Sequence, residues 1–291
     1  MDAVIVAAGE GRRMDGYTDG VPKLFLELHG TTLYERQLAR LEPVCDRLFV
    51  VLGYGFVDEP VDRSRDDTEG GLDGPPDDPS AASPEAFDGE IHVVGSDQAA
   101  AVDSDGGIDL QPSVDSERSV DRESIARRLA TDRDITVSAV VVPHWDRVEN
   151  AESCRHGLRH AEGDVLLLNG DIVYSDAILR TVLDRYDRGP RRSGRSLVAV
   201  KEGIQNEMTA VRWNGEGLIT DYGAIEGHQV AGIFVVNRQH RERACEVLAE
   251  RPTDWFPVVF PAIESTYVAI PPADHFEINT PAHYAAAKRG L

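Results

Sequence analysis

The stretch that decides the fold reads Val4-Ile5-Val6-Ala7-Ala8-Gly9-Glu10-Gly11-Arg12-Arg13-Met14 and is followed by Pro22-Lys23. A short apolar run leads directly into a glycine-bearing loop that carries two arginines. Glycines let backbone N–H groups approach an anion because no Cβ stands in the way. Two arginines and a lysine close together favour a polyphosphate ligand over a single carboxylate. Lys23 stands out further because only three of the 30 Lys and Arg residues are lysines.

Two kinds of nucleotide-binding loop compete for this stretch. A dinucleotide-binding loop needs a third glycine where Met14 stands and an acidic residue at the end of the second strand. Here the second apolar run, Leu48 to Leu52, leads into Gly53-Tyr54-Gly55 instead. The packing role of the third glycine is unfilled, so the sequence argues against a dehydrogenase.

The rest of the chain predicts an α/β fold. Further apolar runs at 135–142 and 165–168 alternate with helical patterns that open at Thr31-Thr32, at Ser124 and at about Ala151. This alternation predicts a doubly wound, mostly parallel sheet, a Rossmann-like three-layer sandwich. Shorter runs at 197–200, 210–213 and 232–236, with Asn214-Gly215 as a hairpin signal, predict added antiparallel strands in the C-terminal half.

We expect one nucleotide-binding domain over residues 1–291, interrupted by an acidic low-complexity insertion at 56–119. That insertion is rich in Asp, Gly, Pro and Ser, and residues 58–134 carry 22 acidic but only 7 basic side chains. Such a composition cannot bury enough apolar surface to offset its ordering entropy, which predicts a largely disordered segment. The run Ile91 to Val94 is its one candidate for a local strand.

Composition limits the partners and the compartment. A formal net charge of −21 and a pI of about 4.7 argue against binding to nucleic acid or to anionic membranes. Excess carboxylates with few lysines indicate a salt-rich, halophilic cytoplasm, although an ordinary acidic surface is the alternative. Three widely spaced cysteines suggest neither a disulfide framework nor a metal site. We expect a cytoplasmic protein without a leader or a membrane span, and the sequence is compatible with a homo-oligomer.

A second group of chemically suited residues ends a later strand. Leu166-Leu167-Leu168-Asn169-Gly170-Asp171 is a buried run that ends in a carboxylate. Ligands of open α/β sheets bind at this carboxyl edge, and an aspartate there can hold Mg²⁺ against phosphate oxygens. The alternative is that Asp171 only forms a turn after Gly170.

The N-terminal stretch, together with the following segment 24–33, resembles the signature of nucleotidyltransferases. The branch is the GT-A-like NTP transferases, which include sugar-1-phosphate and polyol- or choline-phosphate nucleotidylyltransferases. The resemblance covers roughly residues 1–55 and 120–291. It implies that Ala7, Ala8, Gly9 and Gly11 bind the nucleotide's phosphates and that Arg13 and Lys23 are catalytic. Asp171 would bind both the nucleotide and the metal.

Three further segments gain roles from this resemblance. Phe276 to Pro281 resembles the family's Asp-x-Asp-Thr-Pro segment, so Glu277 and Asn279 would complete the metal site, although aspartates are usual at both places. Thr280-Pro281 can also simply begin the last helix. Asn150 and Ser153 resemble the base-reading segment of cytidylyltransferase-like members, while a helix cap by Asn150 is the alternative. Lys201 and Arg212 are the cations available for the acceptor's phosphate. His156 and His160, one turn apart, lack an acidic partner in zinc-site register and are predicted to lie on the surface.

The resemblance implies a Mg²⁺-dependent nucleotidyltransferase of EC 2.7.7 type. It would couple a nucleoside triphosphate, with CTP favoured, to a phosphorylated sugar, polyol or choline-like acceptor and release pyrophosphate, as in nucleotide-sugar biosynthesis. Sugar-1-phosphate transferases that use UTP, TTP or GTP are one alternative. A catalytically silent nucleotide-binding domain that regulates a partner is another.

Overall fold

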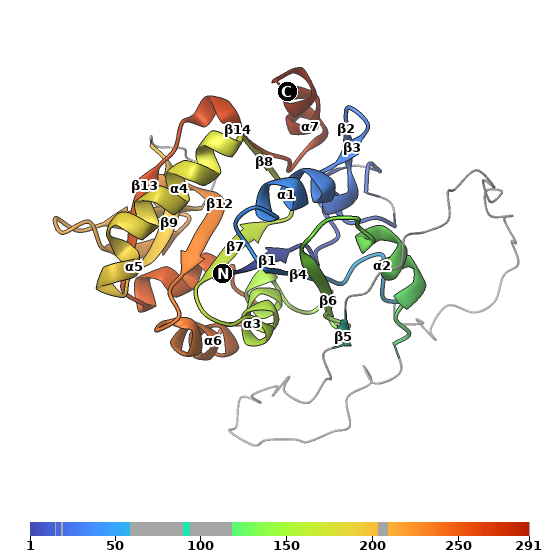
Figure 1. The fold of residues 1–291 in the computed structure, drawn as a ribbon, viewed down its shortest axis with the longest axis horizontal. Coiled ribbons are helices and arrows are strands. Elements are labelled where there is room, and N and C mark those ends of the chain that lie inside the picture. The colour runs from blue at the N-terminus through green and yellow to red at the C-terminus, as the bar shows by residue number, and fades with distance from the viewer. Residues whose placement is uncertain (15, 19, 59–89, 94–117, 203–208, 291) are drawn as a thin grey trace, which may run out of the picture.

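A computed structural model describes residues 1–14, 16–18, 20–58, 90–93, 118–202 and 209–290. Its centre is a ten-stranded mixed sheet with helices on both faces (Figure 1). Along the main path the strand order is β11-β10-β12-β7-β1-β4-β6-β5, and β9 pairs with both β12 and β13. The predicted α/β class, with a mostly parallel half and added antiparallel strands, is confirmed.

The parallel half contains the strands that the apolar runs predicted. β1 lies at its centre and pairs in parallel with β4 on one side and β7 on the other, and β6 continues the sheet beyond β4. All are short and almost wholly buried, as strands covered on both faces must be. Their bounds are Asp2–Val6 for β1, Arg47–Leu52 for β4, Thr136–Val141 for β6 and Val165–Asn169 for β7.

The other half of the sheet is mainly antiparallel. β12 pairs in antiparallel fashion with β7, β9 and β10, and β13 returns parallel to β9. The predicted hairpin at Asn214-Gly215 joins β10 to β11, and the Asn214 N–H donates to the carbonyl of Leu218 across it. The bounds are Ser196–Lys201 for β9, Ala210–Trp213 for β10, Ile219–Gly223 for β11, His228–Val236 for β12 and Ser265–Ala269 for β13.

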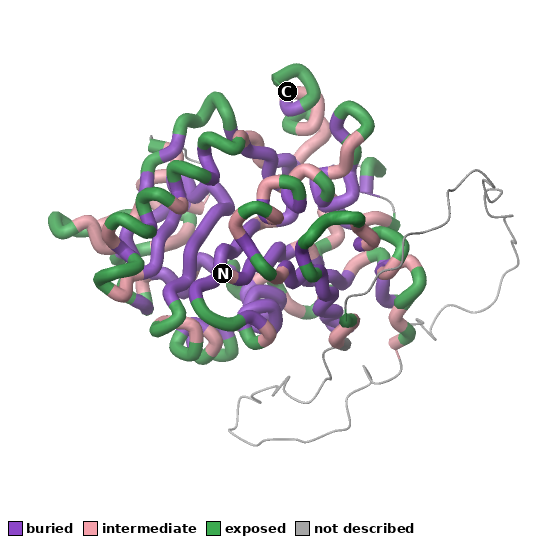
Figure 2. The backbone as a smooth tube through the Cα atoms, in the orientation of Figure 1, coloured by how far each residue is buried: buried purple, intermediate pink, exposed green. Residues whose placement is uncertain are grey.

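The two faces of the sheet have separate cores, because successive side chains of a strand point to opposite sides. On β1, Ala3 and Ile5 pack with α1, α2 and α4, whereas Val4 and Val6 pack with α3, α6 and the 3-10 helix η4. Figure 1 shows α3 and α6 together on one side of the sheet, and Figure 2 shows the buried strands between the layers. The helices span Leu33–Leu41 (α1), Arg122–Leu129 (α2), Asn150–His160 (α3), Asp176–Arg188 (α4), Arg241–Ala249 (α6) and Phe256–Ala262 (η4).

Local sequence signals explain where α1 begins. The Thr32 hydroxyl accepts a hydrogen bond from the N–H of Glu35 at 3.1 Å, and the Glu35 carboxylate accepts one from the N–H of Thr32 at 2.7 Å. This reciprocal capping box satisfies two helix-end donors. The Thr-x-x-Glu spacing in the sequence therefore fixes the start of the helix.

A third, smaller core joins the N-terminal loop to the end of the chain. Met14 is fully buried in it with Ile278 and Ala287. Met14 thus makes hydrophobic contacts that the glycine of a dinucleotide-binding loop could not make at this position. The short elements near it and at the remaining connections are η1 (Arg12–Met14), η2 (Lys23–Phe25), β2 (Glu27–Leu28), β3 (Thr31–Thr32), β8 (Ile172–Tyr174), α5 (Pro190–Ser193), η5 (Pro272–Asp274), β14 (His275–Glu277) and α7 (Pro281–Gly290).

The predicted insertion at 56–119 lies mostly outside the described residues. At its start, Phe56 and Val57 are buried against the main core. The expected strand within it is present as β5, Ile91–Val93, which pairs in parallel with β6. Within the part of the chain that the structure describes, no helix is long and apolar enough to cross a membrane.

Gly157 on α3 provides a test of this packing. A Cβ at this position would lie 2.5 Å from Cγ1 of Val4 and 2.9 Å from Cγ2 of Val51, so the helix sits directly on the sheet. We expect Gly157→Val to lower the free energy of unfolding by about 2–3 kcal/mol, the cost of overpacking a close contact.

The matched control is Ala177→Val on an exposed position of α4, which measures the cost of a β-branched residue in a helix without the contact. Urea denaturation of both variants checks the prediction. Equal losses of stability would show that the helix–sheet contact does not require glycine.

Candidate functional site

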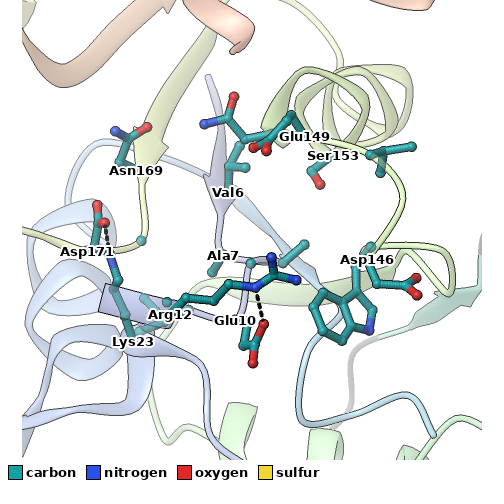
Figure 3. Close-up of a pocket in the computed structure, with 18 of the residues that line it drawn as sticks. Val6, Ala7, Glu10, Arg12, Lys23, Asp146, Glu149, Ser153, Asn169 and Asp171 are labelled. Carbon is teal, nitrogen blue, oxygen red and sulfur yellow. Dashed lines mark hydrogen bonds and ion pairs between the residues drawn. The ribbon is translucent and has the colours of Figure 1, made fainter. Parts of the chain in front are cut away.

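A cavity of about 400 Å³ opens at the carboxyl edge of the parallel strands, as the sheet topology requires for a ligand site. Three segments surround it: the loop after β1, the connection from β6 to α3, and the end of β7 (Figure 3). Its lining residues are Val6, Ala7, Ala8, Gly9, Glu10, Gly11, Arg12, Arg13, Lys23, Leu24, Trp145, Asp146, Val148, Glu149, Asn150, Ser153, Asn169, Gly170 and Asp171. Nine of the predicted site residues are among them.

The glycine loop has the shape that the sequence indicated. Gly11 has φ +71°, in the left-handed region that glycine favours, and a Cβ there would meet the Lys23 side chain at 3.0 Å. Gly9 has open space where a Cβ would point. The loop therefore leaves its backbone accessible at Gly9 and lets the stem of Lys23 pack against Gly11.

The ammonium group of Lys23 lies between two oxygens from distant parts of the chain. Lys23 Nζ is 2.8 Å from Asp171 Oδ2, and it also donates to Asn279 Oδ1 at 2.9 Å. The Arg13 guanidinium donates to the same Asn279 oxygen at 3.1 Å. In Figure 3 the Lys23 side chain reaches Asp171 at the end of β7. The structure thus brings together Arg13, Lys23, Asp171 and Asn279, which the sequence predicted as site residues.

Glu277 is the second carboxylate near Asp171, although it is not among the residues that line the cavity. It lies on β14, which pairs with β8 immediately after Asp171, and its Oε1 accepts a hydrogen bond from the Asn279 amide at 2.6 Å. Burial and the nearby charge of Asp171 raise the pKa of Glu277, while Lys201 and Lys23 act in the opposite direction. Two neighbouring carboxylates in a low-dielectric site favour the presence of a cation.

The donor set fits a hard divalent cation. Asp171 and Glu277 offer carboxylate oxygens, the ligands that Mg²⁺ prefers, and the Lys23 ammonium already bonds to one of them. The amide oxygen of Asn279 accepts bonds from Lys23 and Arg13 in this structure.

The opposite end of the cavity is formed by the segment that leads into α3. Trp145 packs against Gly53, where a Cβ would lie 2.6 Å from the Trp145 Cβ, and its ring meets Tyr54 edge-on at 5.2 Å. The Gly53-Tyr54 pair after β4 therefore supports a wall of the cavity. Ser153 lines the same end and is buried.

Asn150 does not cap α3. Glu149 occupies the N-cap position, and the side-chain oxygen of Asn150 accepts a hydrogen bond from the Phe256 N–H at 2.7 Å. The helix-cap alternative from the sequence is therefore wrong. Asn150 ties α3 to η4 and lines the cavity at the same time.

The two predicted acceptor cations differ in location. Lys201, at the end of β9, is close enough to Glu277 to influence its charge, and burial lowers the pKa of Lys201. Arg212 lies elsewhere, on β10, where it forms an ion pair with Asp221 at 3.7 Å and lines a separate hollow of about 320 Å³. The structure therefore brings Lys201, but not Arg212, to the carboxylate end of the site.

The expectation that His156 lies on the surface is wrong. His156 is buried, and Glu152, one turn earlier on α3, is 2.9 Å from its Nε2. Glu152 also accepts hydrogen bonds from the Arg155 guanidinium at 2.6 and 2.7 Å, and His144 Nε2 is 4.0 Å away. His160 is half-buried and stacks on His92.

His144, Glu152 and His156 carry the ligand types of a zinc site within 4.8 Å of one another. However, the guanidinium of Arg155 already neutralises the carboxylate. We interpret this group as a buried ion-pair network behind the cavity wall.

Comparisons with known proteins agree with this geometry. Residues 3–78 match the family model of the MobA-like NTP transferase domain, and a search of curated proteins found no match. The resemblance to nucleotidyltransferases is thereby confirmed.

Solved structures with this fold support the comparison at the level of architecture. The chain is 12% identical to the CTP:phosphocholine cytidylyltransferase of Streptococcus pneumoniae, with a TM-score of 0.59 and coverage of 99% of this chain and 97% of the other. It is 15% identical to the inositol-1-phosphate CTP transferase of T. maritima (TM-score 0.61, coverage 99% and 94%). A putative glucose-1-phosphate thymidylyltransferase of Bacillus anthracis is 11% identical (TM-score 0.62, coverage 99% and 94%). The likeness of fold to these structures therefore covers far more of the chain than the family model does.

Several lining residues were not predicted. Trp145, Asp146 and Glu149 follow β6, whose carboxyl end meets the same sheet edge as those of β1 and β7. The sequence predicted the strand that precedes them, β6, but these three residues belong to no motif that would mark them as part of a site. The carboxyl-edge rule alone would have identified the segment.

The Glu152 network predicts how stability depends on pH. Burial alone would raise the pKa of Glu152, but the hydrogen bonds from Arg155 and His156 outweigh it and lower the pKa to about 2. A carboxylate with a lowered folded-state pKa stabilises the fold above its unfolded pKa of about 4.3, and this contribution disappears as the pH falls towards 2. We expect Glu152→Gln to destabilise the fold at pH 7 by roughly 3 kcal/mol, because it leaves the Arg155 charge buried without its partner.

Denaturation curves between pH 7 and pH 2 test this expectation. The difference in stability between the wild type and Glu152→Gln should shrink as the pH falls below about 4. The control is Glu123→Gln on the exposed face of α2, whose carboxylate faces solvent and should change little. A constant difference over the whole pH range would contradict a charged Glu152.

Proposed function

We propose that this protein is a Mg²⁺-dependent nucleotidyltransferase that couples a nucleoside triphosphate to a phosphorylated sugar, polyol or choline-like acceptor. The observation that carries the proposal is the position of Lys23. Its ammonium packs beside a glycine loop and lies 2.8 Å from a carboxylate at the carboxyl edge of the sheet. A cation, an accessible backbone and a candidate metal ligand thus lie in one cavity, and transfer of a nucleotidyl group requires such groups around the phosphates.

The reaction needs no covalent intermediate with the protein. A phosphate oxygen of the acceptor attacks the α-phosphorus in line, and the bond from that phosphorus to the bridging oxygen breaks, so that pyrophosphate leaves. The protein contributes by positioning the reactants and by neutralising charge.

Each group then has a role that follows from its location. Ala7, Ala8, Gly9 and Gly11 form the loop along which the triphosphate would lie, Arg13 would contact the β- and γ-phosphates, and Lys23 would stabilise charge at the α-phosphate. Asp171 and Glu277 would hold Mg²⁺, which when bound would draw charge from phosphate oxygens and make the phosphorus more reactive. Lys201, whose charge acts on Glu277, would meet the acceptor's phosphate.

We assign the base to the end of the cavity that is formed by the segment leading into α3, and the residues there support CTP over UTP or TTP as the substrate. Glu149 lines this end, and its carboxylate oxygens can accept hydrogen bonds, whereas both oxygens of Asp146 already accept hydrogen bonds from Arg118 at 2.8 and 3.1 Å. Cytosine presents an amino donor where uracil and thymine present a carbonyl acceptor. The likeness to two structures named as CTP-dependent transferases agrees with this preference.

Turnover by variants of the two central residues tests the reaction. We expect Asp171→Ala to reduce the rate of pyrophosphate release at least ~100-fold, because it removes a metal ligand and the ion-pair partner of Lys23. Lys23→Ala should lower kcat by a similar order, since it removes charge that stabilises the transition state. The control is Lys288→Ala on α7, outside the cavity, which should retain the wild-type rate.

The measurement is pyrophosphate release over four nucleoside triphosphates and a panel of phosphorylated sugars, polyols and choline phosphate. Triphosphate binding without turnover on any acceptor would favour the silent regulatory domain instead.

The preference of the protein for cytosine over uracil gives a separate prediction. We expect Glu149→Ala to reduce the ratio of kcat/KM for CTP to that for UTP by roughly tenfold, the value of one lost hydrogen bond to a charged group. The control is Arg147→Ala, two residues earlier on the same connection and not among the lining residues. An unchanged ratio in Glu149→Ala would rule out this carboxylate as the group that recognises the base.

A further inference from the structure

Asn279 joins both catalytic cations to the second carboxylate. Its side-chain oxygen accepts hydrogen bonds from Lys23 Nζ at 2.9 Å and from Arg13 at 3.1 Å. Its side-chain nitrogen donates to Glu277 Oε1 at 2.6 Å. Asn279 itself is only 4% exposed, so these bonds form in a site largely shielded from solvent.

The chemistry of the neighbours fixes the orientation of this amide. With oxygen and nitrogen exchanged, the NH₂ group would face two cations and the carbonyl would face a carboxylate, so all three contacts would be repulsive. In the observed orientation the two lone-pair directions of the carbonyl oxygen are both used by cationic donors. The oxygen therefore has no remaining direction for a metal ion while Lys23 and Arg13 stay in place.

We infer that Asn279 is a positioning residue that holds Lys23, Arg13 and Glu277 in one hydrogen-bonded unit, and that it is not a ligand of the metal. This inference rests on the proposed function, in which the two cations meet the triphosphate and Glu277 meets the metal. It replaces the role that the sequence predicted for Asn279.

The neutral charge of this side chain is essential to that role. A carboxylate at position 279 would place one oxygen near 2.6 Å from Glu277, where two negative charges repel, and it would pair with both cations. The amide instead directs Lys23 and Arg13 without neutralising them. Their charge then remains available to the phosphates of a bound triphosphate.

The backbone explains why Asn279 can reach all three groups. The N–H of Ile278 donates to the carbonyl of Asp171 at 2.8 Å, which continues the pairing of β14 with β8. The segment after β14 is thereby fixed beside the end of β7. Asn279 follows on the opposite side of the fully buried Ile278 and faces the loop that carries Arg13 and Lys23.

Two binding measurements without turnover separate a positioning residue from a metal ligand. The first is the affinity for Mn²⁺ alone, followed by electron paramagnetic resonance as a substitute for Mg²⁺. The second is the affinity for CTP in the absence of metal and acceptor, followed by calorimetry, with inorganic triphosphate as a second probe. Thermal unfolding of each variant checks that it is folded.

We expect Asn279→Ala to weaken binding of CTP at least ~10-fold, because Lys23 and Arg13 lose the acceptor that orients them. Its affinity for Mn²⁺ should stay within ~3-fold of the wild type, whereas Asp171→Asn should lose Mn²⁺ binding. Asn279→Asp should bind Mn²⁺ more tightly and CTP more weakly than the wild type, because it adds one negative charge. This variant retains an acceptor for both cations and serves if Asn279→Ala does not fold.

A double-mutant cycle with Arg13 tests whether Asn279 acts through the cations. In an Arg13→Ala background, the further change Asn279→Ala should weaken binding of CTP by less than it does in the wild type. Independent effects on CTP binding would contradict the inference.

Three further results would contradict the positioning role of Asn279. A loss of Mn²⁺ binding in Asn279→Ala as large as in Asp171→Asn would make Asn279 a metal ligand. Unchanged CTP binding in Asn279→Ala, or a wild type that binds neither CTP nor inorganic triphosphate, would remove the role in positioning. If the wild type binds CTP but shows no turnover with any acceptor, only the proposed function fails, because the binding measurements still decide the role of Asn279.

Discussion

The parallel pairing of β1 with β7 is the constraint on which the rest of the site depends. Val6 lies opposite Asn169, and the N–H of Gly170 donates to the carbonyl of Val6 at 2.9 Å just beyond the last paired residues. A Cβ on Gly170 would meet the Cβ of Ala7 at 2.8 Å. Only glycine therefore lets the segments that follow β1 and β7 stay this close before they diverge. The glycine loop and Asp171 therefore leave the sheet side by side, and Lys23 can bridge them.

A second backbone pairing brings the last component from far along the chain. β8 begins directly after Asp171 and pairs with β14, which sets Glu277 opposite Ile172. The apolar cluster of Met14, Ile278 and Ala287 then holds the N-terminal loop against the C-terminal helix. Hydrogen bonds of the backbone place the charged groups, and a small hydrophobic core keeps the two chain ends together. The electrostatic contacts among Lys23, Asp171 and Asn279 act on groups that are already positioned.

The sequence predicted those parts of the molecule that local patterns encode. The strands of the parallel half are continuous apolar runs, and the glycine loop and the Thr-x-x-Glu cap are short signals with a direct physical cause. Strands β8 and β14 have three residues each, too few to show a period, so the sequence did not predict their pairing. Only the family resemblance indicated Glu277 as a metal ligand. The partner of Asn150 is the backbone of Phe256, and no rule based on neighbouring residues could identify it. Glu152 stands four residues before His156, so an acidic partner on the same helix face is visible in the sequence, and its hydrogen bond explains why His156 is buried rather than on the surface.

The charge of the whole chain makes the local arrangement of cations more important. A triphosphate that approaches a protein of net charge −21 is repelled at long range, although salt screens this repulsion beyond about 8–10 Å. Most of that negative charge belongs to residues 58–134, whereas Arg13 and Lys23 line the cavity together with Asp171, and Lys201 acts on the charge of the nearby Glu277. Binding energy for an anion must therefore arise inside the cavity, over distances shorter than the screening length. The neutral amide of Asn279 fits this requirement, because it holds two of the three cations in place without removing any of their charge.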